Sequence, residues 1–127
     1  MEVTQNYTYT YDEDADILYI SFAPGEKATT AVELNEHMLL RLNRREERVL
    51  GLTLMNFSVL VQMTEVGPRQ FPLQGLQELE PEWREMVTHL LMESPLNSIL
   101  KVSLYTASCE ESMPIAFVDN APQPLAA

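Results

Sequence analysis

Three aspartates, Asp12, Asp14 and Asp16, alternate along one short acidic segment and give the chain its nearest approach to a metal-binding pattern. Their spacing resembles the start of a calcium-binding EF-hand loop, in which carboxylates at alternate positions ligate the ion. Such a loop also requires Gly at its sixth position and Glu at its twelfth, where this chain has Ile17 and Ala23. The pattern therefore predicts a solvent-exposed hairpin turn, with weak cation binding as the alternative, and no specific metal site.

The other side chains that could ligate a metal or act as a nucleophile are His37, His89 and Cys109, and each is isolated in the sequence. A zinc site needs three or four such ligands, usually with some at close spacing. A Cys-His pair needs a thiolate, which the carboxylates of Glu110 and Glu111 beside Cys109 would disfavour. We therefore predict no catalytic residue, no cofactor and no metal.

The composition excludes further classes of function. The net charge of −11 repels phosphate backbones, so we expect no nucleic-acid partner. The chain contains no P-loop, no G-x-G-x-x-G and no G-x-S-x-G motif, and it has only four glycines. The absence of a signal peptide and of a long apolar run, together with a single cysteine, predicts a cytoplasmic protein without membrane contact.

The acidic segment lies between two stretches that alternate in the manner of β-strands. Residues 7–11 alternate Tyr with Thr, and residues 17–22 place Leu18, Ile20 and Phe22 on one face. Further alternating stretches at residues 29–34, 37–43 and 48–55 predict three more strands joined by short turns. Gly51, inside the last of these, indicates a bulge or a close backbone approach.

Four of the eight basic residues, Arg41, Arg44, Arg45 and Arg48, gather around the turn between the last two of these strands. Glu46 and Glu47 lie among them and leave little local positive charge. We interpret the segment as a solvated hairpin tip and not as a phosphate site.

The second half of the chain adds one clear helix. Residues 80–93 place Trp83, Met86, Val87, Leu90 and Leu91 on one apolar stripe, with His89 flanking it as a surface residue. Residues 56–64 fit a short helix or a strand, and we favour the helix; residues 67–72 predict a loop without regular structure. Strands are expected at residues 99–106 and 115–118, and a flexible tail at residues 119–127.

These elements predict an α+β fold in a single domain spanning residues 1–127. It would comprise an antiparallel meander of about five to six strands, packed against one main amphipathic helix, with one further short helix. Several strands are apolar on both faces, as Leu39 beside Leu40 illustrates. Such strands need cover on both sides, and a second subunit could supply it.

The motif Y-D-x-x-A-D-x-L-Y-I at residues 11–20, followed by Val32-Glu33-Leu34 and Val49-Leu50-Gly51-Leu52, resembles the DUF2283 family of small bacterial proteins of uncharacterised function. The resemblance covers roughly residues 7–58. It implies a small antiparallel sheet followed by a helix, and no catalytic residue or ligand; antitoxin-like pairing with small toxins is suspected for some members. Residues 59–118 would then be an addition to the family core.

Three functional hypotheses remain from the sequence. The first is a non-enzymatic interaction module that forms a homodimer. The second is an antitoxin-like partner of a small basic protein, which a charge of −11 would complement. The third is a small-ligand binder or an enzyme whose site the sequence does not reveal.

Overall fold

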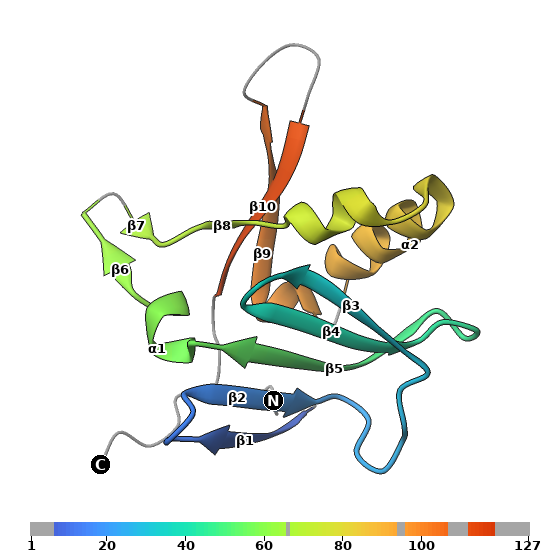
Figure 1. Ribbon diagram of the computed structural model, residues 1–127, viewed down its shortest axis with the longest axis horizontal. Coiled ribbons are helices and arrows are strands. Elements are labelled where there is room, and N and C mark those ends of the chain that lie inside the picture. Colours follow the sequence, from blue (N-terminus) through green and yellow to red (C-terminus); the bar gives the residue numbers. More distant parts are fainter. Residues whose placement is uncertain (1–6, 66, 94–95, 107–111, 119–127) are drawn as a thin grey trace, which may run out of the picture.

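The first half of the chain forms a five-stranded antiparallel sheet. The structure, a computed structural model, describes residues 7–65, 67–93, 96–106 and 112–118. The sheet has the order β1-β2-β5-β4-β3 (Figure 1). Its strands are β1 (Thr8–Asp12), β2 (Ile17–Ser21), β3 (Thr30–Asn35), β4 (Met38–Asn43) and β5 (Arg48–Met55). The α+β fold class predicted from the sequence is confirmed.

The strand order differs from a simple meander, because β2 pairs with β5 and not with β3. Residues 22–29 carry the chain past β5 and β4 to the far edge of the sheet. The pairing of β2 with β5 places Leu18 opposite Leu54 and Ile20 opposite Leu52, and all four side chains are fully buried. The shared apolar face therefore fixes the register between two strands that lie far apart in the sequence.

The second half of the chain builds a separate layer. It begins with a single helical turn, α1 (Phe57–Leu60), and two short strands, β6 (Met63–Thr64) and β7 (Gly67–Pro68). A second sheet of order β8-β10-β9 and three helical segments complete it. These elements are β8 (Phe71–Pro72), η1 (Gln74–Glu78), α2 (Pro81–Leu91), η2 (Leu96–Ser98), β9 (Leu100–Thr106) and β10 (Ser112–Val118).

Two expectations about this half need correction. The segment of residues 67–72 was expected to lack regular structure, which is wrong: β7 pairs with β6, and β8 pairs with β10. Pro72 is tolerated there because β8 lies at the edge of its sheet, where a missing N–H costs no ladder bond, and Phe71 buries its ring. The last strand also begins at Ser112, earlier than residue 115.

Other local expectations hold. The favoured helix within residues 56–64 is confirmed at α1, with β6 following it. The apolar stripe of α2 is confirmed, since Trp83, Val87 and Leu91 are buried while Met86 and Leu90 are partly buried. The expected flexible tail at residues 119–127 lies outside the described residues.

The two layers share one hydrophobic core. Buried side chains of β2 to β5 form a single cluster with those of α1, η1, α2, η2 and the second sheet. The added residues therefore cover one face of the five-stranded sheet, and they do not extend it. In Figure 1 the β9–β10 hairpin rises beyond β3, with α2 beside it.

The junction between the layers depends on Gly75 in η1. A Cβ atom at this position would lie 1.8 Å from the carbonyl oxygen of Glu33 and 2.9 Å from that of Leu34. No side chain fits in that space, because real Cβ atoms do not approach backbone this closely. Gly75 therefore lets η1 pack directly on the backbone of β3.

Candidate functional site

The acidic segment forms a network that ties the β1–β2 hairpin to α1. Asp16 adopts a left-handed φ of 57°, which aspartate tolerates better than most residues. Its carboxylate accepts hydrogen bonds from the Tyr11 hydroxyl at 2.7 Å and from the Ser58 hydroxyl at 2.6 Å. The backbone N–H of Ser58 donates to both carboxylate oxygens, at 3.1 and 3.2 Å. Asp16 thus serves as the anchor of α1.

The hydrogen bonds around Asp16 also set its ionisation. The bond from the Ser58 hydroxyl is the main cause that lowers the pKa of Asp16, and the Tyr11 hydroxyl and the Ser58 N–H add to it. The same contact with Asp16 raises the pKa of Tyr11. A carboxylate held in its charged form by three donors is a poor general acid, so the arrangement fits a structural role.

The other acidic side chains of this segment are less engaged. Asp12 accepts a hydrogen bond from the Ala15 N–H at 3.1 Å and so closes the turn, while Asp14 is exposed. The exposed hairpin turn predicted from the sequence is thus found. Within residues 7–65, 67–93, 96–106 and 112–118, no group of three His, Cys, Asp or Glu side chains is arranged to hold a metal ion.

The two histidines lie in separate environments. His37 contacts the Asn56 side chain through Nδ1 at 3.2 Å and packs its ring edge against Phe71. His89 is exposed, as expected, and its Nε2 lies 2.7 Å from a carboxylate oxygen of Glu93, just beyond the end of α2. Cys109 lies outside the described residues, so the structure does not place it relative to either histidine.

The four arginines near the β4–β5 turn have separate roles. Residues 44–47 are exposed, as a solvated tip should be, but Arg44 also lies over the Trp83 ring, with 4.3 Å from its guanidinium carbon to the ring centre. Arg48 pairs with Glu26 and Glu46, and these contacts raise the pKa of Arg48 and lower that of Glu26. The turn is therefore tied to α2 and to the loop after β2.

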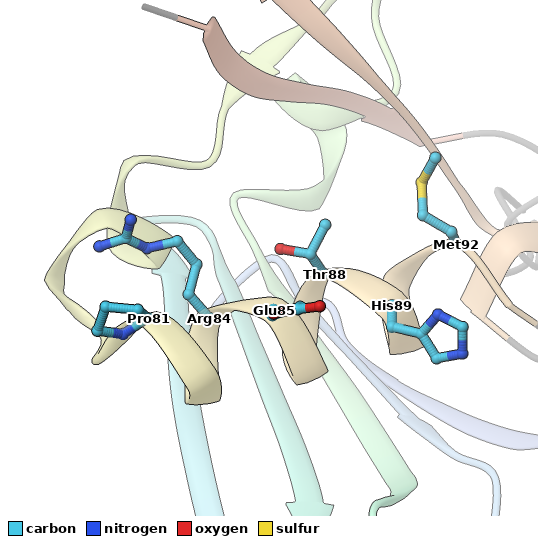
Figure 2. Close-up of a pocket in the computed structure, with 6 residues that line it drawn as sticks. All are labelled: Pro81, Arg84, Glu85, Thr88, His89 and Met92. Atoms are coloured by element: carbon cyan, nitrogen blue, oxygen red, sulfur yellow. The ribbon is translucent and has the colours of Figure 1, made fainter.

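A hollow of about 440 Å³ lies along the outer side of α2. Figure 2 shows its six lining side chains spread along the helix without converging on one point; they are Pro81, Arg84, Glu85, Thr88, His89 and Met92. Arg84 donates hydrogen bonds to the carbonyl oxygens of Leu76 and Gln77 in η1 and of Leu79 just after it, so these donors are not available to a ligand. The hollow therefore lacks a convergent set of polar groups of the kind that ligand sites have.

The second face of the five-stranded sheet, which we call the open face, is the larger unassigned surface. Within the described part of the chain, none of its side chains joins the core cluster. Tyr19 is 41% exposed, and Leu39, Ile17 and Met55 are half-buried. Its residues in cross-strand order are Arg48 and Asn43 in the row next to the β4–β5 turn, Thr8, Ser21, Gly51, Arg41 and Ala31 in the second, Thr10, Tyr19, Thr53, Leu39 and Glu33 in the third, and Asp12, Ile17 and Met55 in the fourth.

Arg41 lies flat across the middle of the open face. Its Nη2 donates to the Ile20 carbonyl oxygen at 3.3 Å, so the side chain crosses from β4 over β5 to β2. It passes directly over Gly51, where a Cβ atom would lie 2.5 Å from Nη2. The buried Nε of Arg41 has no hydrogen-bond partner, and Arg41 forms no ion pair with any described residue.

Sequence reasoning missed the role of Arg41, although it identified Gly51. The prediction of a bulge or a close approach at Gly51 is confirmed on both counts, because the β4–β5 register shifts between Arg41 and Leu42. An arginine at an alternating strand position with a glycine on the next strand was the available signal. Reading it required the register that this bulge sets.

A second unassigned surface is the outer edge of β1. Among the described strands, β1 has β2 as its neighbour and no partner on its other side. The strand contains no Lys, Arg or Pro, and its single charge is Asp12 at the end. Native proteins usually protect sheet edges with such residues, so β1 remains able to pair with an added strand.

Comparison with known proteins identifies the first part of the chain. Residues 8–58 match the model of a family described as "Protein of unknown function (DUF2283)". No curated protein and no solved structure matches the chain. Among the described residues, no helix combines the length and apolar character of a membrane span. The matched segment runs from β1 into α1, so it contains both the Asp16 network and the open face. The chain therefore carries a DUF2283 segment at residues 8–58, as its motif indicated, and continues it with a C-terminal layer of its own.

Proposed function

We propose that this protein is a non-enzymatic interaction module that associates with a second copy of itself through the open face. The observation that carries this proposal is the state of Arg41. A half-buried guanidinium with an unpaired Nε, in the centre of a face that the described elements leave uncovered, lacks the acidic partner that a desolvated charge normally has. A protein surface that covered the face would supply that partner to Nη1, the guanidinium nitrogen that is neither buried nor hydrogen-bonded to a described residue.

The apolar residues of the open face support the same proposal. Tyr19, Leu39 and Met55 surround the buried Thr53 and would lose further contact with water under a second sheet. Antiparallel sheets commonly leave one face in water, but that face is then mainly polar. This one carries Tyr19, Met55 and Arg41, and aromatic residues, Met and Arg are enriched at protein interfaces.

The size of the face sets the expected strength. Five strands about 4.8 Å apart and about five residues long give roughly 400 Å² of sheet per copy, or roughly 800 Å² in a symmetric pair. Stable complexes bury roughly 1,200–2,000 Å². We therefore expect a weak homodimer whose population depends on concentration.

Sedimentation equilibrium from about 1 µM to about 1 mM tests this proposal. The proposal predicts a monomer–dimer equilibrium with a midpoint inside this range. A monomer at every concentration would refute it. Native mass spectrometry of the protein isolated from its own cells complements the measurement, because it also detects any other bound partner.

A basic protein partner is the second candidate. The unprotected edge of β1 runs into the exposed acidic residues Asp12, Glu13 and Asp14, so an added strand rich in Lys or Arg would gain both backbone pairing and charge contacts. This candidate corresponds to the hypothesis of an antitoxin-like partner of a small basic protein, and it places the protein in the cytoplasm. Recovery of a basic protein of similar size in stoichiometric complex would favour it over the homodimer.

A further inference from the structure

We infer that the homodimer is held in register by a reciprocal ion pair, in which Arg41 of each copy binds Glu33 of the other. This inference rests on the proposed self-association and adds which charges select the partner. Both residues lie on the open face, on the neighbouring strands β4 and β3. Each meets the other when two copies of this face are related by a two-fold axis that passes midway between them.

Glu33 is suited to the role because it is free to pair. Its side chain is exposed, and it forms no ion pair or side-chain hydrogen bond with any residue the structure describes. Its backbone is held firmly, since η1 packs on its carbonyl oxygen through Gly75. The carboxylate thus projects from a fixed strand.

Arg41 is suited because its guanidinium is already oriented. Gly51 lets it lie flat on the sheet, and the Ile20 carbonyl holds one of its nitrogens. A planar guanidinium that keeps further N–H donors can bind a carboxylate with little additional ordering.

The location of the pair also favours a second copy as the occupant. The guanidinium lies over the central strand β5, and Glu33 lies on the edge strand β3, so the midpoint between them falls near β4. A two-fold axis that lies between the two sheets and passes through that point places β5, β4 and β3 of one copy on β3, β4 and β5 of the other, which is about three fifths of each open face. Leu39, which lies beside Glu33 in its row, would then be covered in the same interface.

The charges of the open face distinguish pairing with a second copy from binding to a partner surface that is generally acidic or generally basic. The open face also carries Arg48, which pairs with Glu26 and Glu46, and Asp12, which closes its own turn. Among the described residues, Arg41 and Glu33 are therefore the opposite charges of this face that can pair between two copies. The chain as a whole, at −11, repels a second copy. The reciprocal contacts must therefore act at short range against a general repulsion, which explains why specific charges at this position matter.

Charge-reversal variants test the inference. Arg41→Glu and Glu33→Arg should each raise the dimer dissociation constant at least about tenfold, because each places like charges opposite one another. A mixture of the two variants should form heterodimers preferentially, since both contacts become attractive again. The double variant Arg41→Glu/Glu33→Arg should recover homodimers. Native mass spectrometry distinguishes these species by mass.

Matched controls use exposed residues away from the open face. Arg45→Glu and Glu78→Arg change the net charge by the same amounts, at the β4–β5 turn and at the end of η1. They should show no preference for heterodimers when mixed. Circular dichroism melting curves of all variants establish that each remains folded.

The outcomes separate the inference from the proposal beneath it. If the single variants dimerise as the wild type does, the ion pair is refuted while self-association stands. If they weaken the dimer but neither the mixture nor the double variant recovers it, reciprocal pairing is likewise refuted. A wild-type protein that stays monomeric refutes the proposed function and the inference together.

Discussion

The Asp16 network yields the sharpest prediction about stability. In Asp16→Asn the side chain keeps its size and tolerates the left-handed φ of 57°, but it loses the charge and exchanges one acceptor oxygen for an amide donor. At least one of the donors from Tyr11 and Ser58 then loses its partner. Because no backbone strain is introduced, the loss in stability measures the hydrogen bonds.

The magnitude follows from the kinds of bond that change. Hydrogen bonds to a charged group contribute about 1.5–3 kcal/mol and neutral ones about 0.5–1.5 kcal/mol. Since the site is partly exposed, we expect a total loss of about 1–2 kcal/mol for Asp16→Asn at pH 7. Urea unfolding should show a midpoint lower by about 0.5–1 M.

The loss should depend on pH in a defined direction. The folded state lowers the pKa of Asp16 below the ordinary value of 3.8, so its contribution is complete above that value and disappears as the pH falls through the folded pKa. The difference between wild type and Asp16→Asn should therefore shrink toward zero on acidification below pH 3.8.

Asp14→Asn provides the matched control for this prediction. It removes the same charge from the same turn, and its side chain is exposed, so we expect a change within about 0.5 kcal/mol. Ser58→Ala should lower the stability by less than Asp16→Asn does, because it removes the hydroxyl donor and keeps the backbone N–H that also binds Asp16. Equal unfolding midpoints for Asp16→Asn and Asp14→Asn would refute the anchoring role.

Three further substitutions probe packing. Gly75→Ala should destabilise the fold by about 3 kcal/mol in urea unfolding, since its Cβ would collide with the β3 backbone; a wild-type midpoint would contradict the packing of η1 on β3. Gly51→Ala should displace Arg41 from the sheet and weaken dimerisation in sedimentation equilibrium, and an unchanged dimer would contradict that packing. Val87→Ala should cost about 2 kcal/mol of unfolding free energy, whereas Thr88→Ala, on the outer side of α2, should cost less than about 0.5 kcal/mol.

Local patterns made much of the first half predictable. The strands of the main sheet alternate with period two, and polar turns of two to four residues separate β1 from β2, β3 from β4 and β4 from β5, so these positions follow from neighbouring residues alone. The stripe from Trp83 to Leu91 predicts α2 in the same way. These signals do not depend on the rest of the chain.

What sequence reasoning missed depends on contacts between distant residues. Asp16 and Ser58 are 42 positions apart, and nothing near either residue indicates that they meet. The pairing of β2 with β5 and the β4–β5 bulge likewise depend on long-range register. The strand at Phe71–Pro72 is two residues long, too short for any periodic pattern, and its proline argued against it.

The two edges of the main sheet differ in a way that limits how far the protein can assemble. The edge at β3 is blocked where η1 packs against Glu33 and Leu34, and a register irregularity follows between Glu33 and Asn35. The edge at β1 carries no such obstruction among the described strands. A sheet that accepts a new strand at one end only cannot propagate, because two chains joined at β1 present blocked edges outward. The fold can therefore leave the β1 edge open to strand pairing, and this sheet still cannot extend into a fibre.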